Sequence, residues 1–304
     1  MRLRTTPAGG VAANPALLFV ASLALFVMSV GRDATTSVAA LVAVIFLHET
    51  GHYLGMRAFG YRNVRMFFIP FFGGGASGMK ETAPAWQEAV VLLLGPVPGL
   101  VVGLVLAASG AAHQEPWVYD LAFTLVVLNA FNLLPLFPLD GGRLFEVLLL
   151  ARRPAATAVF RLLAVAGLGL IAWDAGSWVL GVLAGLMLLG TPLASSQAGA
   201  AVGFRAAYPD AADTPEGLRD DQLADLVRRA QYQGQTKPRP LAQLAMWVRD
   251  VHAQATTDRA AGSTVAFFVG IYLIAWVTAL AGVVNLVVLP AGPDEGEPPA
   301  VRAE

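Results

Sequence analysis

The residues best suited to chemistry form the run His48-Glu49-Thr50-Gly51-His52, an H-E-x-x-H pattern inside an apolar stretch. On a helix, the spacing of four puts both imidazoles on one face, where two neutral ring nitrogens can bind one Zn²⁺. The carboxylate of Glu49 then lies close enough to take a proton from a water held by that metal. Without a metal, the run would be a buried histidine pair beside a carboxylate, which is costly in an apolar setting. The pattern therefore predicts His48 and His52 as metal ligands and Glu49 as a general base.

The overall composition is that of a protein embedded in a membrane. Of its 304 residues, 56% are hydrophobic and 13% are charged; the net charge is -1 and there is no cysteine. This balance offers no basic surface, so we expect no nucleic-acid partner. The absence of cysteine excludes disulfides and thiolate ligands, so that His, Asp or Glu must hold any metal.

Seven apolar stretches are long enough, or nearly so, to cross a bilayer. They run over about residues 15–30, 34–58, 86–108, 117–134, 156–173, 177–193 and 263–289. The sequence therefore predicts an all-α polytopic membrane protein with about seven transmembrane helices, a short membrane-associated β-loop and a small helical cytoplasmic segment. For the first stretch, a cleaved signal peptide is the alternative, although no clear cleavage site follows it.

A second informative run, from Asn132 to Asp140, ends the fourth apolar stretch. Pro135 and Pro138 remove two amide donors and disfavour a helix, so we expect unwound backbone here. Such backbone is tolerated inside a membrane only where protein encloses it. Asp140 can supply the third ligand that a catalytic zinc needs, leaving the fourth position open. An ordinary helix end with a turn aspartate is the alternative for this run alone.

Two stretches between these runs break the helical pattern. Residues 61–79 combine aromatic and β-branched residues with Pro70 and Gly73-Gly74-Gly75, which predicts short strands at the membrane surface or dipping into it. A plain connecting loop is the alternative there. Gly95-Pro96-Val97-Pro98-Gly99 interrupts the third stretch, where its prolines should kink or break the helix.

The stretches divide the chain into six parts. These are a tail and first span (1–33), a membrane core with both motifs (34–153), two packing spans (154–194), a soluble helical segment (195–262), the last span (263–290) and a disordered acidic tail (291–304). In the soluble segment we expect one amphipathic helix over Thr214–Gln233 and another that buries Leu241 and the apolar residues at helical spacing after it. His252 in the second helix, and His113 in a loop, are predicted to face solvent and not to bind metal.

The distribution of Lys and Arg indicates the orientation in the membrane. If the N-terminus is cytoplasmic and seven spans alternate, 18 of the 20 Lys and Arg lie on the cytoplasmic side, all but Arg32 and Arg302. The positive-inside rule favours this topology, with the soluble segment cytoplasmic and the C-terminal tail on the opposite side. The second and fourth spans then bring His48, His52 and Asp140 to one depth near the cytoplasmic leaflet.

Taken together, the motifs resemble the site-2 protease family of intramembrane zinc metalloproteases, peptidase family M50. The resemblance covers about residues 34–150 and rests on the H-E-x-x-H run, the pair Gly95-Pro96 and the N-x-x-P-x-x-P-x-D-G run. It implies one Zn²⁺ per chain, held by His48, His52 and Asp140.

The resemblance also implies roles around the metal. Glu49 would be the general base, and Asn132 would hold the substrate peptide or the developing oxyanion. Gly74 and Gly75 would lie where a substrate strand pairs with the β-loop. The chain departs from better-known branches because there is no room between its second and third spans for a PDZ domain. Its 68-residue soluble segment is also too short for the paired nucleotide-sensing modules of some members.

The implied activity is that of a zinc metalloendopeptidase that cleaves transmembrane protein substrates within or next to their spans, in regulated proteolysis at a bacterial cell membrane. The alternative is a non-enzymatic membrane protein, either a metal transporter or an inactive scaffold, that uses the same His/Asp cluster. Transporters usually carry polar residues along several helices, whereas the polar residues here cluster in one place, which favours the protease. A zinc protease with a soluble catalytic domain is disfavoured because no such domain is present. The sequence gives no indication of the oligomeric state.

Overall fold

The computed structural model describes residues 35–69, 73–79, 83–109, 111–151, 153–212, 217–232, 241–256 and 260–288. The first predicted span and the predicted acidic tail lie outside these residues. Five helical stretches of the described residues are long and apolar enough to cross a membrane: Ala39–Ala58, Ala85–Ala108, Pro154–Asp174, Leu180–Ala207 and Gly262–Val287. The predicted class, a mostly helical multi-pass membrane protein with a small sheet, is confirmed, while the number of seven spans stays a prediction.

The helix with the H-E-x-x-H run leads directly into a β-hairpin. α2 (Thr35–Ala58) is followed by a turn at Gly60, whose φ of 76° suits a residue without a side chain. β1 (Arg62–Ile69) and β2 (Gly73–Met79) then pair antiparallel in a two-stranded sheet that packs on α2. The expected short strands are therefore present, and the alternative of a plain loop is excluded.

The third predicted span is broken where its glycines and prolines predict. α3 (Ala85–Leu94) ends before Gly95, and α4 (Pro96–Ala108) begins directly after it. The prolines at 96 and 98 have no N–H to donate along the helix, which explains the interruption. The short α5 (Ala111–Gln114) then connects α4 to the next helix.

The second motif is unwound, as expected. α6 (Pro116–Asn132) has 17 residues and is not among the five helices long enough to span, although it lies between α2 and α4 in the same bundle. No helix or strand covers residues 133–139, and α7 (Asp140–Phe145) begins at the predicted ligand. A short π-helix, η1 (Glu146–Leu150), follows α7.

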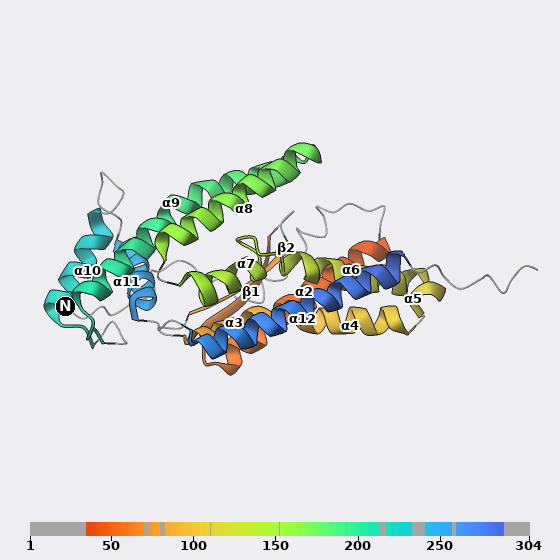
Figure 1. Ribbon diagram of the computed structural model, residues 1–304, viewed down its shortest axis with the longest axis horizontal. Coiled ribbons are helices and arrows are strands. Elements are labelled where there is room, and N and C mark those ends of the chain that lie inside the picture. Colours follow the sequence, from red (N-terminus) through yellow and green to blue (C-terminus); the bar gives the residue numbers. More distant parts are fainter. Residues whose placement is uncertain are drawn as a thin grey trace, which may run out of the picture.

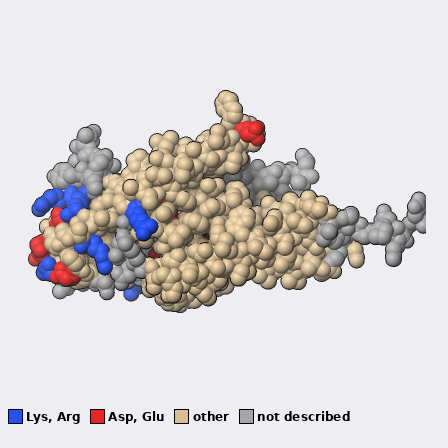
Figure 2. Space-filling model, viewed as in Figure 1, with Lys and Arg blue, Asp and Glu red and all other residues tan. Residues whose placement is uncertain are grey.

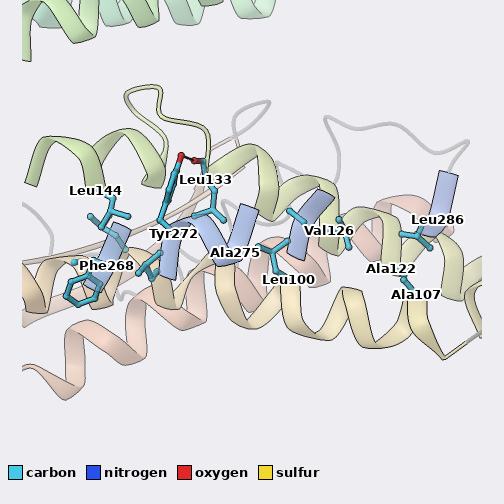
Figure 3. Close-up of a cluster of buried hydrophobic side chains, with 14 of the residues drawn as sticks. Leu100, Ala107, Ala122, Val126, Leu133, Leu144, Phe268, Tyr272, Ala275 and Leu286 are labelled. Carbon is cyan, nitrogen blue, oxygen red and sulfur yellow. Dashed lines mark hydrogen bonds between the residues drawn. The ribbon is translucent and has the colours of Figure 1, made fainter. Parts of the chain in front are cut away.

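The last described helix, α12 (Gly262–Val287), lies along α4 and α6 and closes the core (Figure 1). Its buried side chains meet those of the other core helices in one apolar cluster that includes Leu100, Val126, Leu133, Leu144, Phe268 and Tyr272 (Figure 3). The Tyr272 hydroxyl donates a hydrogen bond of 2.7 Å to the Leu133 carbonyl, at the start of the unwound run. The last helix thus satisfies a backbone group that the end of α6 leaves without a helical donor.

Two long helices form a hairpin beside this core. α8 (Pro154–Asp174) and α9 (Trp178–Ala207) pack along one another, as Figure 1 shows. α9 continues without a break through Pro192 and through the predicted boundary at residue 194. That boundary is therefore not a structural one. A single proline removes one helical hydrogen bond, and the part of the helix beyond it buries Phe204 against the helices that follow.

The predicted soluble segment folds as a small bundle of the end of α9, α10 (Asp220–Tyr232) and α11 (Leu241–Thr256). On the face shown in Figure 2, most of the visible Lys and Arg side chains lie at the end of the molecule that holds this bundle, and the helices that extend away from this end show almost none. This distribution matches an apolar membrane region joined to a water-exposed bundle.

Three expectations for this segment were wrong. The first helix does not run on continuously from Thr214, which lies outside the described residues: residues 217–219 are not α-helical, and α10 begins at Asp220, where the Gln222 side chain accepts a hydrogen bond of 3.0 Å from the Arg219 amide, as a cap does. Leu241 is 70% exposed, since it is the first residue of α11 and precedes the buried stripe. His252 is fully buried in the bundle, where its Nε2 lies 2.9 Å from the carbonyl oxygen of residue 212. The side chain of His113 is outside the described residues.

Candidate metal centre

Two histidines on one helix meet an aspartate from a distant part of the sequence in a buried cluster. The Nε2 atoms of His48 and His52 lie 3.1 Å apart, and each lies 3.1 Å from Oδ2 of Asp140. All three residues are buried. The helical spacing of four brings the two imidazoles together on α2, and the unwound run brings Asp140 to them at the start of α7.

The other nitrogen of each imidazole is committed to an acceptor. His48 Nδ1 lies 2.8 Å from Oδ1 of Asn129, and His52 Nδ1 lies 2.8 Å from the carbonyl oxygen of Val91. Because a carbonyl oxygen can only accept, both Nδ1 atoms carry the hydrogen in the neutral ring. Both Nε2 atoms therefore present lone pairs to one another and to the carboxylate.

Three lone-pair donors at 3.1 Å repel one another unless a cation lies between them. Ligand atoms about 2.0–2.1 Å from a tetrahedral zinc lie about 3.3 Å apart, close to the observed triangle. Histidine ligands that donate their second N–H to an oxygen acceptor are usual in such sites. The cluster of His48, His52 and Asp140 thus fits Zn²⁺ binding, with one side left for a further ligand.

Two glycines allow α2 to lie directly against the broken helix pair. A Cβ on Gly51 would collide with the carbonyl oxygen of Leu94, and a Cβ on Gly95 would collide with the imidazole of His52. The interruption between α3 and α4 therefore makes room for a candidate ligand. One turn before the interruption, the Val91 carbonyl orients that ligand.

The loop before Asp140 is held just as closely. A Cβ on Gly141 would collide with the Leu133 carbonyl, and one on Gly142 would collide with the backbone of Leu136. The unwound run thus folds back over the first turn of α7. The hydroxyl of Tyr272, on α12, also donates a hydrogen bond to the Leu133 carbonyl at the start of the loop. The loop that positions Asp140 is therefore fixed both at Leu133 and where it meets α7.

Glu49 lies beside the cluster on α2. Its side chain is buried, and Oε2 has no hydrogen-bond partner among the described residues. A carboxylate oxygen buried without a donor is costly unless a water or substrate group completes it. Glu49 is thus available to exchange a proton with a group bound next to the cluster.

The residues predicted to contact substrate lie outside the His48, His52 and Asp140 cluster, on α6 and β2. Asn132 is half-buried at the end of α6, where its Nδ2 donates a hydrogen bond of 3.1 Å to the Leu128 carbonyl. In β2, Gly74 pairs with Phe68 and Gly75 pairs with Phe67 of β1. These positions are compatible with the predicted roles, which stay predictions.

Sequence reasoning missed Asn129, the partner of His48. It lies on α6 three residues before the asparagine that the motif singles out, and it is fully buried. An asparagine among apolar residues in a membrane span needs a partner, so its position alone was a usable signal. What no sequence signal showed is which of the two asparagines would face the histidines.

Comparisons with known proteins agree with the motifs. Residues 36–121 match the model of peptidase family M50. A zinc metalloprotease of Methanocaldococcus jannaschii is 28% identical over 114 residues, which are 36% of this chain and 33% of that protein. Stage IV sporulation protein FB of Bacillus subtilis is 31% identical over 119 residues, 38% of this chain and 40% of that protein. The chain thus spans about a third to two fifths of these relatives.

Among solved structures, the site-2 protease from Methanocaldococcus jannaschii aligns with 60% of this chain and 87% of its own, at 22% identity and a TM-score of 0.42. The family match ends before Asp140, so the meeting of this residue with the histidines is a separate observation. The resemblance predicted from the motifs is confirmed for residues 36–121, which match the model of peptidase family M50 and resemble these two relatives.

Proposed function

We propose that this protein is a zinc-dependent intramembrane protease that hydrolyses peptide bonds within or next to the transmembrane segments of other membrane proteins. The observation that carries the proposal is the buried triangle of His48, His52 and Asp140, in which both histidine Nδ1 atoms face oxygen acceptors; beside it, Oε2 of Glu49 has no hydrogen-bond partner among the described residues. The family match of residues 36–121 supports the same activity.

In the proposed reaction, bound zinc and Glu49 have different roles. When bound, zinc would supply a Lewis acid that polarises the scissile carbonyl and makes water a stronger nucleophile at neutral pH. Glu49 accepts the proton of the attacking water and returns it to the leaving amine. The buried position of Glu49 excludes bulk water from this exchange.

A helical substrate must also be unwound before cleavage, because its peptide bonds are shielded from attack by the surrounding helix. In our proposal the substrate unwinds locally, and the free edge of the β1–β2 hairpin near Gly74 and Gly75 pairs with it. Asn132, at the end of α6, holds the peptide or the developing oxyanion. Backbone pairing would give affinity without demanding one particular sequence.

The orientation follows from charge. We propose that the N-terminus and the bundle of α9, α10 and α11 are cytoplasmic and that the C-terminal tail lies opposite, in a bacterial cell membrane, with the protein acting in regulated proteolysis. This topology puts 18 of the 20 Lys and Arg on the cytoplasmic side.

Replacement of Glu49 tests the activity. Membranes from cells with wild-type protein are compared with those from cells with Glu49→Gln, and peptide termini inside or beside apolar spans are identified by mass spectrometry. We expect at least one membrane protein to lose such a terminus and accumulate uncut in the variant. The purified variant should still bind zinc, since Glu49 is not one of the three proposed ligands.

A substrate found in this way is then incubated with the purified full chain in liposomes. Cleavage by wild type and none by Glu49→Gln supports the proposal, whereas equal cleavage by both contradicts it. Zinc flux into the same liposomes that survives Glu49→Gln would instead favour a metal transporter.

A further inference from the structure

The two candidate histidine ligands are oriented by different kinds of group. His52 donates to a backbone carbonyl, that of Val91, which any residue would supply at that position. His48 faces the side chain of Asn129, which lies 81 residues away in the chain. The orientation of His48 therefore depends on one particular side chain, whereas that of His52 depends on the path of α3.

The hydrogen bonds of Asn129 determine which end of its side-chain amide faces His48. Its Nδ2 donates a hydrogen bond of 2.7 Å to the Leu125 carbonyl, one turn earlier on α6. This bond fixes which end of the amide is nitrogen, so that Oδ1 faces His48 as an acceptor. The residue is fully buried, and both ends of its amide are thus satisfied.

The space for this amide is created by Gly99 on α4. A Cβ at position 99 would collide with Nδ2 of Asn129 and lie 2.9 Å from its Cγ. Gly99 comes four residues after Gly95, so both lie on one face of the broken helix pair. The two glycines of the Gly95–Gly99 run then serve the two histidines: one admits the His52 ring, and the other admits the amide that orients His48.

From these contacts we propose that Asn129 is a positioning residue for the metal centre, which holds His48 with Nε2 unprotonated and aimed at the metal, and that Gly99 keeps its amide in place. The inference rests on the proposed zinc site. An amide suits this task because it orients the ring without adding a further charge to a membrane core that already holds Glu49 and Asp140.

A merely structural role would have a different signature. If Asn129 only packed α6 against α4, a leucine of similar volume would change the stability of the metal-free protein and leave the zinc affinity alone. If Asn129 positions His48, the leucine should change the stability of the metal-free protein little, because without metal the His48 ring can carry its hydrogen on Nε2 and donate it to Asp140. Zinc affinity should then fall by about 10–100-fold, the usual cost of losing such a partner.

The experiment uses the purified full chain in detergent, with Zn²⁺ titrated against a chelator of known affinity and thermal unfolding followed without metal. Asn129→Leu should show the loss of affinity with a nearly unchanged unfolding temperature. Asn129→Asp keeps an oxygen acceptor for His48, and its protonated carboxyl, which burial favours, can still donate to the Leu125 carbonyl, so it should bind zinc within about threefold of wild type. Gly99→Ala should weaken binding in the same direction as Asn129→Leu.

Asn132→Leu is the matched control. Asn132 lies on the same helix and donates the same kind of bond, to the Leu128 carbonyl, but no bond to a histidine is observed. Its replacement should leave zinc affinity within about twofold of wild type.

The proposal is overturned if folded Asn129→Leu binds zinc as tightly as wild type, or if Asn129→Asp is as weak as Asn129→Leu. Should Asn129→Leu not fold, Gly99→Ala and Asn129→Asp still decide the matter, because unchanged binding in Gly99→Ala together with weakened binding in Asn129→Asp would overturn it. If the wild-type protein binds no zinc, the proposed function itself fails, which is a separate result.

Discussion

The core around the metal centre and the α8–α9 hairpin are both rich in small residues, yet they use glycine differently. In the core, a Cβ on Gly51, Gly95 or Gly99 would collide with a backbone carbonyl, a candidate ligand or the amide behind it. In the hairpin, a Cβ on Gly167 or Gly185 would meet nothing within 4 Å. Glycine therefore has two different uses: in the core it permits close approach around the candidate metal centre, and in the hairpin it leaves a smooth helix surface toward the bilayer.

The two regions also differ in where their polar and apolar groups point. The core turns its histidines and carboxylates inward to one another. The hairpin turns large apolar residues outward: Leu163, Leu170 and Leu189 are 67%, 71% and 77% exposed. Outward leucines without protein contacts are what lipid contact requires. The side chains of the core thus fix the geometry of the candidate metal centre, whereas those of the hairpin suit contact with lipid.

The largest expected effect is the loss of Asp140, the proposed ligand that lies outside the family match. Asp140→Leu should reduce zinc affinity by more than the about 10–100-fold typical of an outer partner, because one of three direct ligands is gone. Proteolysis should disappear with it. Zinc content of the purified protein, measured by mass spectrometry, checks this result. A variant that binds zinc as tightly as wild type would show that Asp140 is not a ligand.

A glycine exchange in each region tests the comparison itself. Gly95→Ala should lower zinc affinity by about 10–100-fold, because the new methyl group occupies the space of the His52 ring. Gly185→Ala, the control in the hairpin, should not change zinc affinity and should stabilise α9 by about 0.5–1 kcal/mol through helix propensity. Zinc titration and thermal unfolding of both variants are compared. An equal loss of zinc affinity in Gly95→Ala and Gly185→Ala would contradict the different roles of glycine in the two regions.

An effect on stability, and not on zinc affinity, is expected where the two regions join. Arg161 of α8 forms hydrogen-bonded ion pairs of 2.5 and 2.7 Å with Glu146 and lies 3.9 Å from the Phe137 ring centre. Arg161→Met leaves a largely buried carboxylate unpaired, which should cost about 3–5 kcal/mol of stability. The double variant Arg161→Met with Glu146→Leu should recover most of it. Thermal unfolding measures both, and a double variant no more stable than the single one would refute this explanation.

Much of the site could be predicted from the sequence because each part has its own local pattern. The spacing of four fixes the two histidines on one helix face, and the two prolines before Asp140 fix the unwound backbone. The broken helix at Gly95 follows from the same proline chemistry.

Other parts depend on contacts that no local pattern contains. Nothing in the sequence distinguishes Asn129 from Asn132 as the partner of His48, since the choice depends on how α6 is rotated against α2. His252 was misplaced for a similar reason, because tertiary packing in the bundle and a backbone acceptor bury it. The continuation of α9 past Pro192 likewise depends on the packing of Phe204.

The most direct test of the central claim is zinc K-edge X-ray absorption on the purified full chain, with wild type compared with His52→Leu and Asp140→Leu. We expect wild type to show nitrogen and oxygen ligands at about 2.0–2.1 Å, with the outer-shell scattering of two imidazoles. His52→Leu should lose one imidazole contribution, and Asp140→Leu should keep both or bind no zinc. Zinc bound with the same spectrum in all three proteins would contradict the proposed centre.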